Sequence, residues 1–253
     1  MSIATISIIL LTTIVSSFIS GIFGMAGGLI LMGVIVAIVP VATAMILHGA
    51  IMMAANSWRA WLLRDNIDWP VFRRYLIGAA IGLVGLTWIA WRPDKTAVYL
   101  VLAAVPILVW IPKSWLALDI RAPGQAEIAG VIVQGLNSLA GVAGPLLDAF
   151  FVRTDMTRQE IVATKSATQA ISHLIKILFW SVPFLGAAAS SADNWPPALL
   201  IAAAIPLSML ATYGGKRLLD RMTDTNFQTW VKSLITGIGA IYFVRAAAGL
   251  GLV

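Results

Sequence analysis

Two sets of polar side chains lie inside long apolar stretches of this sequence, and they are the residues best suited to bind a charged ligand. The sets are His48, Met52, Asn56 and Arg59, and Lys165, Gln169, His173 and Lys176. Within each set the members occupy positions i, i+4, i+8 and i+11, so they share one face of an α-helix. Neither set contains an acidic residue. A charge at the centre of a bilayer costs ~2.5–3.5 kcal/mol, so we expect a bound anion to compensate these cations.

Other interpretations of the same residues remain open. Arg59 and Lys176 lie near the ends of their apolar stretches, so their side chains are also suited to reach the membrane interface. The same holds for Lys165, about five residues into its stretch. The uncharged members of the two sets could instead join helices by hydrogen bonds.

Two glycine-rich breaks precede the polar sets. The first contains Gly21, Gly24, Gly27 and Gly28, and the second contains Gly141, Gly144 and Pro145. Glycine lets another backbone or a ligand approach closely, and proline interrupts a helix. The helix that begins after such a break presents free N–H groups and partial positive charge, which suits an anion. The alternative is close helix packing, for which Gly78 and Gly82 have the usual spacing.

Composition indicates where these residues must be held. The 253-residue chain is 60% hydrophobic and 11% charged, with a mean hydropathy of +0.92. A soluble domain is about 45–50% apolar and ~25% charged, so soluble enzymes and nucleic-acid-binding proteins are excluded. At ~20 residues per span, the apolar residues fill about seven or eight transmembrane helices. With no cysteine, disulfides and thiolate metal sites are excluded as well.

The apolar stretches predict helices, because their length and continuity do not suit barrel strands. They cover residues 3–39 with a break, 41–63, 71–91, 96–111, 127–152 with a break, 160–182, 198–215 and 227–250. We therefore expect a single transmembrane domain over residues 1–253. Charged and Pro-rich connectors separate the stretches, and the longest connector runs from residue 112 to 125.

The chain also repeats itself weakly. A shift of 117 residues places Gly24 on Gly141, His48 on Lys165 and Arg59 on Lys176. This relation predicts two repeats, about 1–116 and 126–253. If each broken stretch is a re-entrant hairpin, eleven Lys and Arg residues fall on one membrane side and three on the other. If each crosses once, the split is eight against six. The positive-inside rule favours the hairpins.

The predicted fold is therefore an all-α polytopic membrane protein of two inverted repeats, each a glycine-broken re-entrant hairpin followed by about three transmembrane helices. Both chain ends are expected on the non-cytoplasmic side. We expect residues 21–28 and 141–145 to be non-helical and to lie close together at the bilayer centre. Asp148, just after the second break, is expected to be solvated, with pairing to a nearby cation or uptake of a proton during transport as the alternatives.

At the breaks and the helices after them, the sequence resembles the sulfite exporter TauE/SafE family of membrane permeases. The matching segments are Gly21-Ile-Phe-Gly24-Met-Ala-Gly27-Gly28, Gly135-Leu-Asn-Ser-Leu-Ala-Gly141-Val-Ala-Gly144-Pro145-Leu-Leu, Ala163-Thr164-Lys165 and His173-Leu-Ile-Lys176-Ile. They lie in both halves of the chain. The resemblance implies transport of small sulfur-containing anions such as sulfite or sulfonates.

These observations predict a secondary transporter that moves a small inorganic or organic anion by alternating access, because paired broken helices are typical of such proteins. An intramembrane enzyme acting on an anionic lipid or peptide, and an anion channel, are the alternatives. The substrate site is expected at both breaks and both polar sets, with Lys165 essential for binding. We expect no catalytic residue, metal, cofactor or nucleic-acid partner. A coupling proton or cation and a homodimer are compatible with the sequence, and the expected location is a cell membrane such as a bacterial inner membrane.

Overall fold

The computed structural model describes residues 1–23, 26–89, 92–112, 115, 118–186, 195–219 and 224–252. Within these ranges the chain forms helices and no strands. The helices are α1 (Ile3–Phe23), α2 (Ala26–Ile38), α3 (Val41–Leu62), the 3-10 turn η1 (Arg64–Asn66), α4 (Trp69–Ile89), α5 (Lys95–Trp110), α6 (Gln125–Ala140), α7 (Gly144–Ala149), α8 (Arg158–Gly186), α9 (Ala198–Leu219) and α10 (Asp224–Gly249). The chain is thus an all-α polytopic membrane protein, as predicted.

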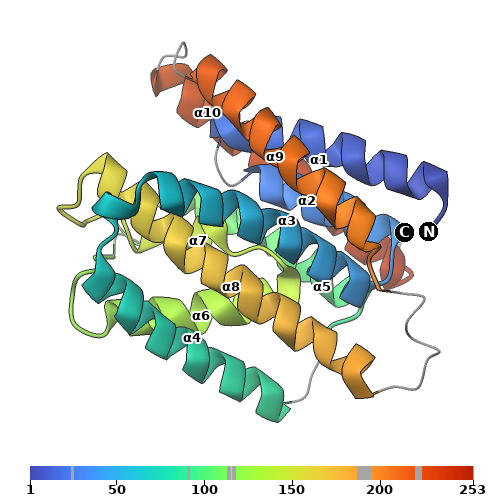
Figure 1. Cartoon of the computed structure of the whole chain (residues 1–253), viewed down its shortest axis with the longest axis horizontal. Helices are drawn as coiled ribbons and strands as arrows, with labels where there is room; N and C mark the ends of the chain where they lie inside the picture. Colours follow the sequence, from blue (N-terminus) through green and yellow to red (C-terminus); the bar gives the residue numbers. More distant parts are fainter. Residues whose placement is uncertain are drawn as a thin grey trace.

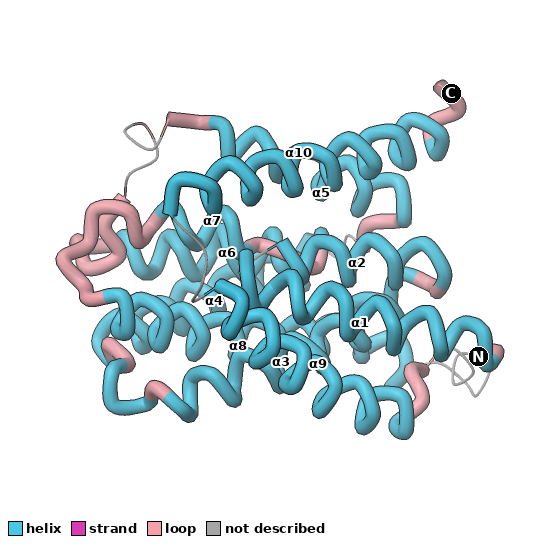
Figure 2. Tube along the Cα trace, turned by 90° about the horizontal axis from the view of Figure 1, so that it is seen from above, coloured by secondary structure: helices cyan, strands magenta, loops and turns pink. Residues whose placement is uncertain are grey.

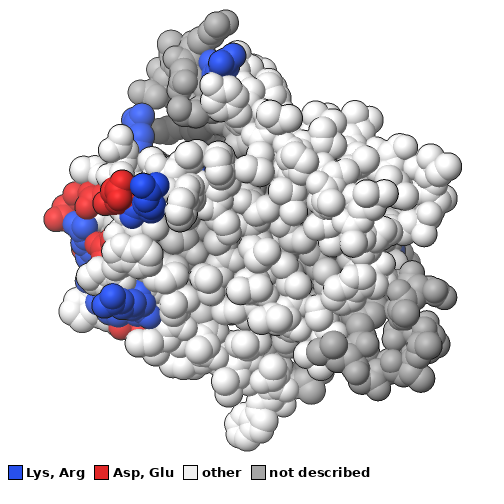
Figure 3. Space-filling model, viewed as in Figure 1, with Lys and Arg blue, Asp and Glu red and all other residues white. Residues whose placement is uncertain are grey.

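The helices lie side by side and mostly along one direction (Figure 1), and the view from above shows the same stacking (Figure 2). Within the described residues, four helical segments are long and apolar enough to cross a membrane: Ile3–Ile22, Val41–Leu62, Trp69–Ile89 and Ala198–Gly215. On the face shown in Figure 3, the charged side chains gather at one end of the molecule, and both chain ends lie at the other end in Figure 1. Which membrane side each end faces stays a prediction from the positive-inside rule.

Both breaks are narrower than the sequence predicted. Residues 21–23 complete α1 and residues 26–28 begin α2, so the expectation that all of 21–28 is non-helical is wrong. Of the predicted second break, residues 141–145, only residues 141–143 are non-helical, because Gly144 and Pro145 open α7. Proline is accommodated there because the first turn of a helix needs no N–H donor. The prediction for Gly24 concerns a residue outside the described ranges.

The two hairpins also differ in size. Helix α1 has 21 residues and α2 has 13, and the two pack against each other. At 1.5 Å per residue α1 is ~31 Å long and spans a bilayer by itself, whereas α2 reaches only ~20 Å. In the second half α6 has 16 residues and α7 only 6. The first hairpin therefore has one arm long enough to cross a bilayer and a shorter second arm, and the second hairpin has one very short arm.

Helix α8 begins where a capping box fixes its start. The Thr157 N–H donates to Glu160 Oε2 at 2.7 Å, and the Glu160 N–H donates to Thr157 Oγ1 at 3.3 Å. This reciprocal pair satisfies N–H groups that the first turn leaves free. Helix α8 then runs for 29 residues, farther than the predicted 160–182, and this extension changes the setting of Lys176.

Helices α4 and α6 approach so closely that their backbones touch. A Cβ added to Gly78 would collide with the Glu127 carbonyl, and one added to Gly130 would collide with the Tyr75 carbonyl and lie 2.7 Å from the Ala79 nitrogen. Gly82 faces the Val131 carbonyl in the same way, at 2.9 Å from an added Cβ. The packing interpretation of Gly78 and Gly82 is therefore confirmed.

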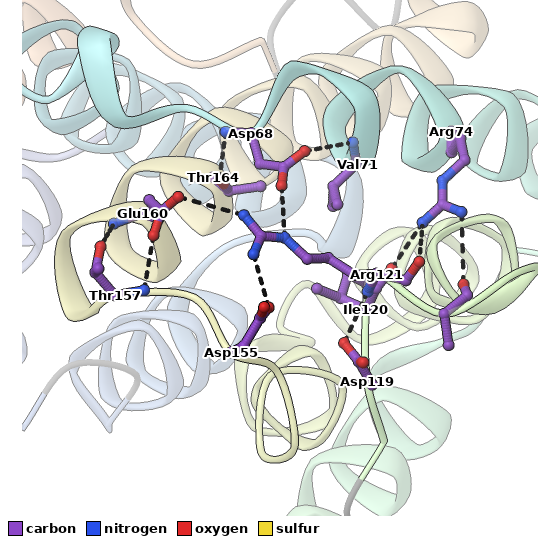
Figure 4. Close-up of polar contacts among 11 residues, drawn as sticks. Asp68, Val71, Arg74, Asp119, Ile120, Arg121, Asp155, Thr157, Glu160 and Thr164 are labelled. Atoms are coloured by element: carbon purple, nitrogen blue, oxygen red, sulfur yellow. Dashed lines mark hydrogen bonds and ion pairs between the residues drawn. The ribbon is translucent and has the colours of Figure 1, made fainter.

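One guanidinium joins three loops at the charged end (Figure 4). Arg121 lies in the connector between the halves, and its side chain pairs with Asp68 Oδ2 at 2.9 Å, Asp155 Oδ1 at 2.7 Å and Glu160 Oε1 at 3.3 Å. The pairing with Asp155, and then with Asp68, raises the pKa of Arg121. Arg121 in turn holds the pKa of Asp155 below its usual range. The connector is thereby fixed to the segments before α4 and before α8.

The α4–α6 contact generates a prediction with a control in the same helix. Gly130→Ala should lower stability by ~1–3 kcal/mol, because its Cβ meets backbone atoms that cannot move aside. Gly135→Ala should raise stability by up to ~1 kcal/mol, because alanine favours a helix more than glycine and nothing lies within 4 Å of an added Cβ there. Melting temperatures of the purified variants measure both effects, and equal shifts would contradict the close contact.

The Arg121 cluster generates a second prediction. Arg121→Gln should cost about 1–2 kcal/mol at neutral pH, since partly exposed ion pairs contribute up to ~1 kcal/mol each. A carboxylate with a lowered pKa stabilises the fold above its unfolded value of about 3.9 and loses that contribution as the pH falls through the folded pKa. The gap between wild type and variant should therefore shrink below about pH 4. A gap that is unchanged across a pH series of melting curves would contradict this assignment.

Candidate functional site

Lys176 is the charged residue at the centre of the candidate site. Its side chain is fully buried, with 0% exposure, and it extends from the middle of α8. The ammonium donates to the Gly141 carbonyl at 2.9 Å and to His48 Nδ1 at 2.9 Å. The interface interpretation of Lys176 is therefore wrong. Because α8 continues to Gly186, Lys176 lies well away from the helix end.

His48 extends this contact to the first half of the chain. Its Nε2 lies 3.1 Å from the Gly28 carbonyl, in the first turn of α2. An ammonium only donates hydrogen bonds, so His48 Nδ1 accepts from Lys176 and the ring hydrogen resides on Nε2. Nε2 then donates to Gly28. One chain of three hydrogen bonds thus runs from the second break, at Gly141, to the start of the helix after the first break, at Gly28.

Gly141 has the backbone conformation that makes its carbonyl available. It caps the C-terminus of α6 with φ 83°, in the left-handed region that favours glycine. The carbonyl groups at a helix C-terminus carry partial negative charge, which stabilises a cation placed against them. A Cβ on Gly141 would also lie 2.7 Å from the Met32 sulfur of α2. Glycine at this position therefore serves both the turn and the contact between the two hairpins.

His173 and Gln169 line the same side of α8 as Lys176. The His173 ring packs edge-on against the His48 ring, with centroids 5.6 Å apart. Among the residues that the structure describes, His173 Nδ1 and Gln169 Nε2 are buried and have no hydrogen-bond partner. A buried polar group without a partner costs ~1–3 kcal/mol. The structure thus brings His48, His173 and Lys176 together, with an unpaired nitrogen on His173 and another on Gln169, two turns before Lys176 on the same helix.

Lys165 and Arg59 are placed differently from Lys176. Lys165 forms an ion pair with Asp148 of α7, and both side chains are a little over one-quarter exposed. Asp148 is therefore paired rather than simply solvated. We predicted that Lys165 needs an anion because its own helix face carries no acidic residue. Asp148 supplies an acidic partner from another helix, so that reason does not apply to Lys165. Arg59 lies in the last turn of α3, close enough to Lys165 for the two cations to repel each other. Asn56 donates to the Met52 carbonyl of its own helix at 2.9 Å.

The glycines and proline of the breaks have unequal surroundings. A Cβ on Gly27 would collide with the Ser16 carbonyl and Ser20 of α1, so Gly27 permits close contact within the hairpin. Gly28 faces the site, because its Cβ would lie 3.8 Å from His48 Nε2. Gly144 and Pro145 begin α7, whose 6 residues give it only a small dipole. The expected pair of opposed helix N-termini is therefore weak on this side.

Two buried amides on α6 were missed in the sequence. Gln134 and Asn137 are both fully buried, in the turns that lead to the second break. Together with Ser138 and Gly141 they occupy positions i, i+3, i+4 and i+7, one face of the helix. That spacing of polar residues ahead of a glycine break was a usable signal. It was overlooked because neither residue is charged and neither belongs to the two aligned sets.

Comparison with known proteins assigns the chain to a family. The sequence model of the sulfite exporter TauE/SafE family matches residues 8–242. The chain belongs to this family. The match spans both breaks and both polar helices, and it confirms the resemblance seen in the sequence. TauE/SafE proteins are membrane transporters of sulfur-containing anions, so this chain is a membrane transporter by family. No curated protein and no solved structure matches the chain significantly.

Proposed function

We propose that this TauE/SafE protein is a secondary transporter that carries a small anion, such as sulfite or an organosulfonate, across a cell membrane by alternating access. The observation that carries the proposal is the ammonium of Lys176, buried between the two helix breaks. Its two hydrogen-bond partners, the Gly141 carbonyl and His48 Nδ1, are neutral acceptors, and no ion pair to it is found among the described residues. A buried amine without a counter-charge is costly to protonate, and a bound anion would supply the charge that stabilises its protonated form.

The anion would meet several donors at once. Lys176 has three N–H groups, and two of them are used by Gly141 and His48. The third would bind an oxyanion in an environment of low dielectric constant, where such interactions are strong. The unpaired Gln169 amide lies two turns earlier on the same face of α8 and offers a further donor along the helix. Donors that are fixed before the ligand arrives bind it without the cost of ordering them.

Two features support the inverted repeat on which alternating access depends. By chain order, α1 to α5 correspond to α6 to α10. Helix α1 packs on α9 and its counterpart α6 packs on α4, while α3 meets α9 as α8 meets α4. Helices α3 and α8, and likewise α5 and α10, pack on each other. Exchanging the two halves therefore leaves these main helix contacts unchanged.

The same relation holds between single residues. The shift of 117 residues pairs His48 with Lys165, and Arg59 with Lys176. The hydrogen bond between His48 and Lys176 thus has the pair Lys165 and Arg59 as its counterpart, and these two cations are also neighbours. Only antiparallel α3 and α8 allow both contacts, and Figure 1 shows the two helices running in opposite directions. An inverted repeat requires this geometry.

The test combines binding with transport. Lys176→Met should weaken sulfite binding at least about 30-fold, the effect of losing ~2 kcal/mol from a buried charged contact. It should nevertheless leave the ligand-free protein folded, because methionine has a similar volume and removes a buried charge. Binding is measured as the rise in melting temperature with sulfite concentration. Saturable counterflow of sulfite in proteoliposomes then distinguishes a carrier from a channel.

Two further variants make the result specific. Lys95→Met removes a cation whose ammonium lies in an exposed contact with the Ala37 carbonyl, and it should change neither binding nor counterflow. Lys165→Met should have a smaller effect than Lys176→Met, because Asp148 already neutralises Lys165. Normal counterflow by Lys176→Met would overturn the proposed site, and a larger loss in Lys165→Met would transfer the main role to Lys165.

A further inference from the structure

Besides donors, the candidate site contains buried acceptors that an ordinary oxyanion cannot satisfy. Asn137 is 0% exposed, and among the described residues neither its Nδ2 nor its Oδ1 has a hydrogen-bond partner. Gln134 is also 0% exposed, and its Oε1 is unpaired within the same part of the chain. Exchanging the two amide atoms of Asn137 would still leave one acceptor without a donor. Each such group costs ~1–3 kcal/mol in the buried state.

Neighbouring contacts place these amides beside Lys176. Gln134 Nε2 lies 3.5 Å from the Ser172 carbonyl of α8, and the Gly141 carbonyl accepts from Lys176 at 2.9 Å. Asn137 lies between Gln134 and Gly141 on the same face of α6, at i+3 and i−4. This face of α6 therefore meets α8 along the turn that carries Ser172, His173 and Lys176.

A ligand that only accepts hydrogen bonds fits one part of this arrangement. A bare oxyanion would bind Lys176 and the free amide hydrogens, but its oxygens would face the Asn137 and Gln134 oxygens without a hydrogen between them. Two acceptors that face each other repel, and no new hydrogen bond compensates for the water that each has lost. A ligand that also carries an O–H or N–H would satisfy the acceptors as well.

We propose that Asn137, assisted by Gln134, selects oxyanions that carry a hydrogen-bond donor of their own, either an acid proton on the oxyanion or a hydroxyl or amino group next to it. Asn137 is then a specificity-determining residue of the site. This inference rests on the proposed function and defines its substrate class. Sites built to bind a donor discriminate strongly against analogues that lack it, because their buried groups are left unpaired.

The experiment uses two pairs of anions that differ in one donor. Hydroxymethanesulfonate and methanesulfonate test a hydroxyl on the ligand. Phosphate and sulfate, of similar shape, test an acid proton, because phosphate keeps one at neutral pH and sulfate does not. Affinities are obtained from the rise in melting temperature of the intact wild-type protein with concentration. At least one pair should show tighter binding of the donor-bearing member by about tenfold or more, the effect of one buried hydrogen bond.

Asn137→Leu, which keeps the branched shape and the number of heavy atoms and removes the acceptor, should reduce that preference toward parity. Ser208→Ala is the control, because the buried Ser208 hydroxyl bonds the Ile205 carbonyl of its own helix α9, and it should keep the preference. The wild-type comparison stands by itself if Asn137→Leu does not fold. Equal affinities within both pairs would overturn the inference. If Lys176→Met still abolished that binding, the proposed function would stand. If none of the four anions and no sulfite bound, both would fall.

Discussion

The constraint on which the rest of this structure depends is the burial of one ammonium in a membrane protein. An ion moved from water into a medium of low dielectric constant loses several kcal/mol even after relaxation. The fold compensates Lys176 with a helix C-terminal carbonyl, at Gly141, and with the ring of His48. The carbonyl becomes available only because α6 ends there in a left-handed glycine. The His48 tautomer is fixed from both sides, because Nδ1 accepts from Lys176 and the Gly28 carbonyl accepts from Nε2. The two breaks are therefore parts of one electrostatic arrangement, although they lie more than 100 residues apart in sequence.

The two lysines of the site differ in whether a protein carboxylate already neutralises them. Lys165 is paired with Asp148 and partly open to solvent. Lys176 is fully enclosed and bonded to neutral acceptors. An anion gains less at the first lysine, because it competes with a carboxylate already in place. At the second it provides the missing charge. Since both lysines extend from α8, a substrate moving along this helix would pass from a position of competition to one of binding.

The sequence predicted most of the fold because the signals were periodic and local. Apolar stretches located the helices, and glycine breaks located the hairpins. The prediction of a wide break at residues 21–28 was wrong because glycine does not prevent a helix; it permits one where Gly27 lies against α1. The pairing of Lys165 with Asp148 depends on the length and direction of α7, which composition does not encode. Lys176 was assigned to a helix end because the apolar run stops before the helix does. Gln134 and Asn137 were missed because a buried amide is recognised by its lack of partners, and that is a three-dimensional property.

The proposed symmetry gives these differences a mechanical meaning. If the halves are inverted repeats, the hydrogen-bonded pair His48 and Lys176 and the nearby pair Lys165 and Arg59 occupy equivalent positions. They are not equivalent in this structure: the first is a buried hydrogen bond, whereas in the second Lys165 is paired with Asp148 and feels the charge of Arg59. The hairpins are likewise unequal, with 13 residues in α2 and 6 in α7. A symmetric molecule would be equally open or closed at both ends. The proposed alternating access would need one end held together while the other is not, and unequal environments at equivalent residues would provide that difference.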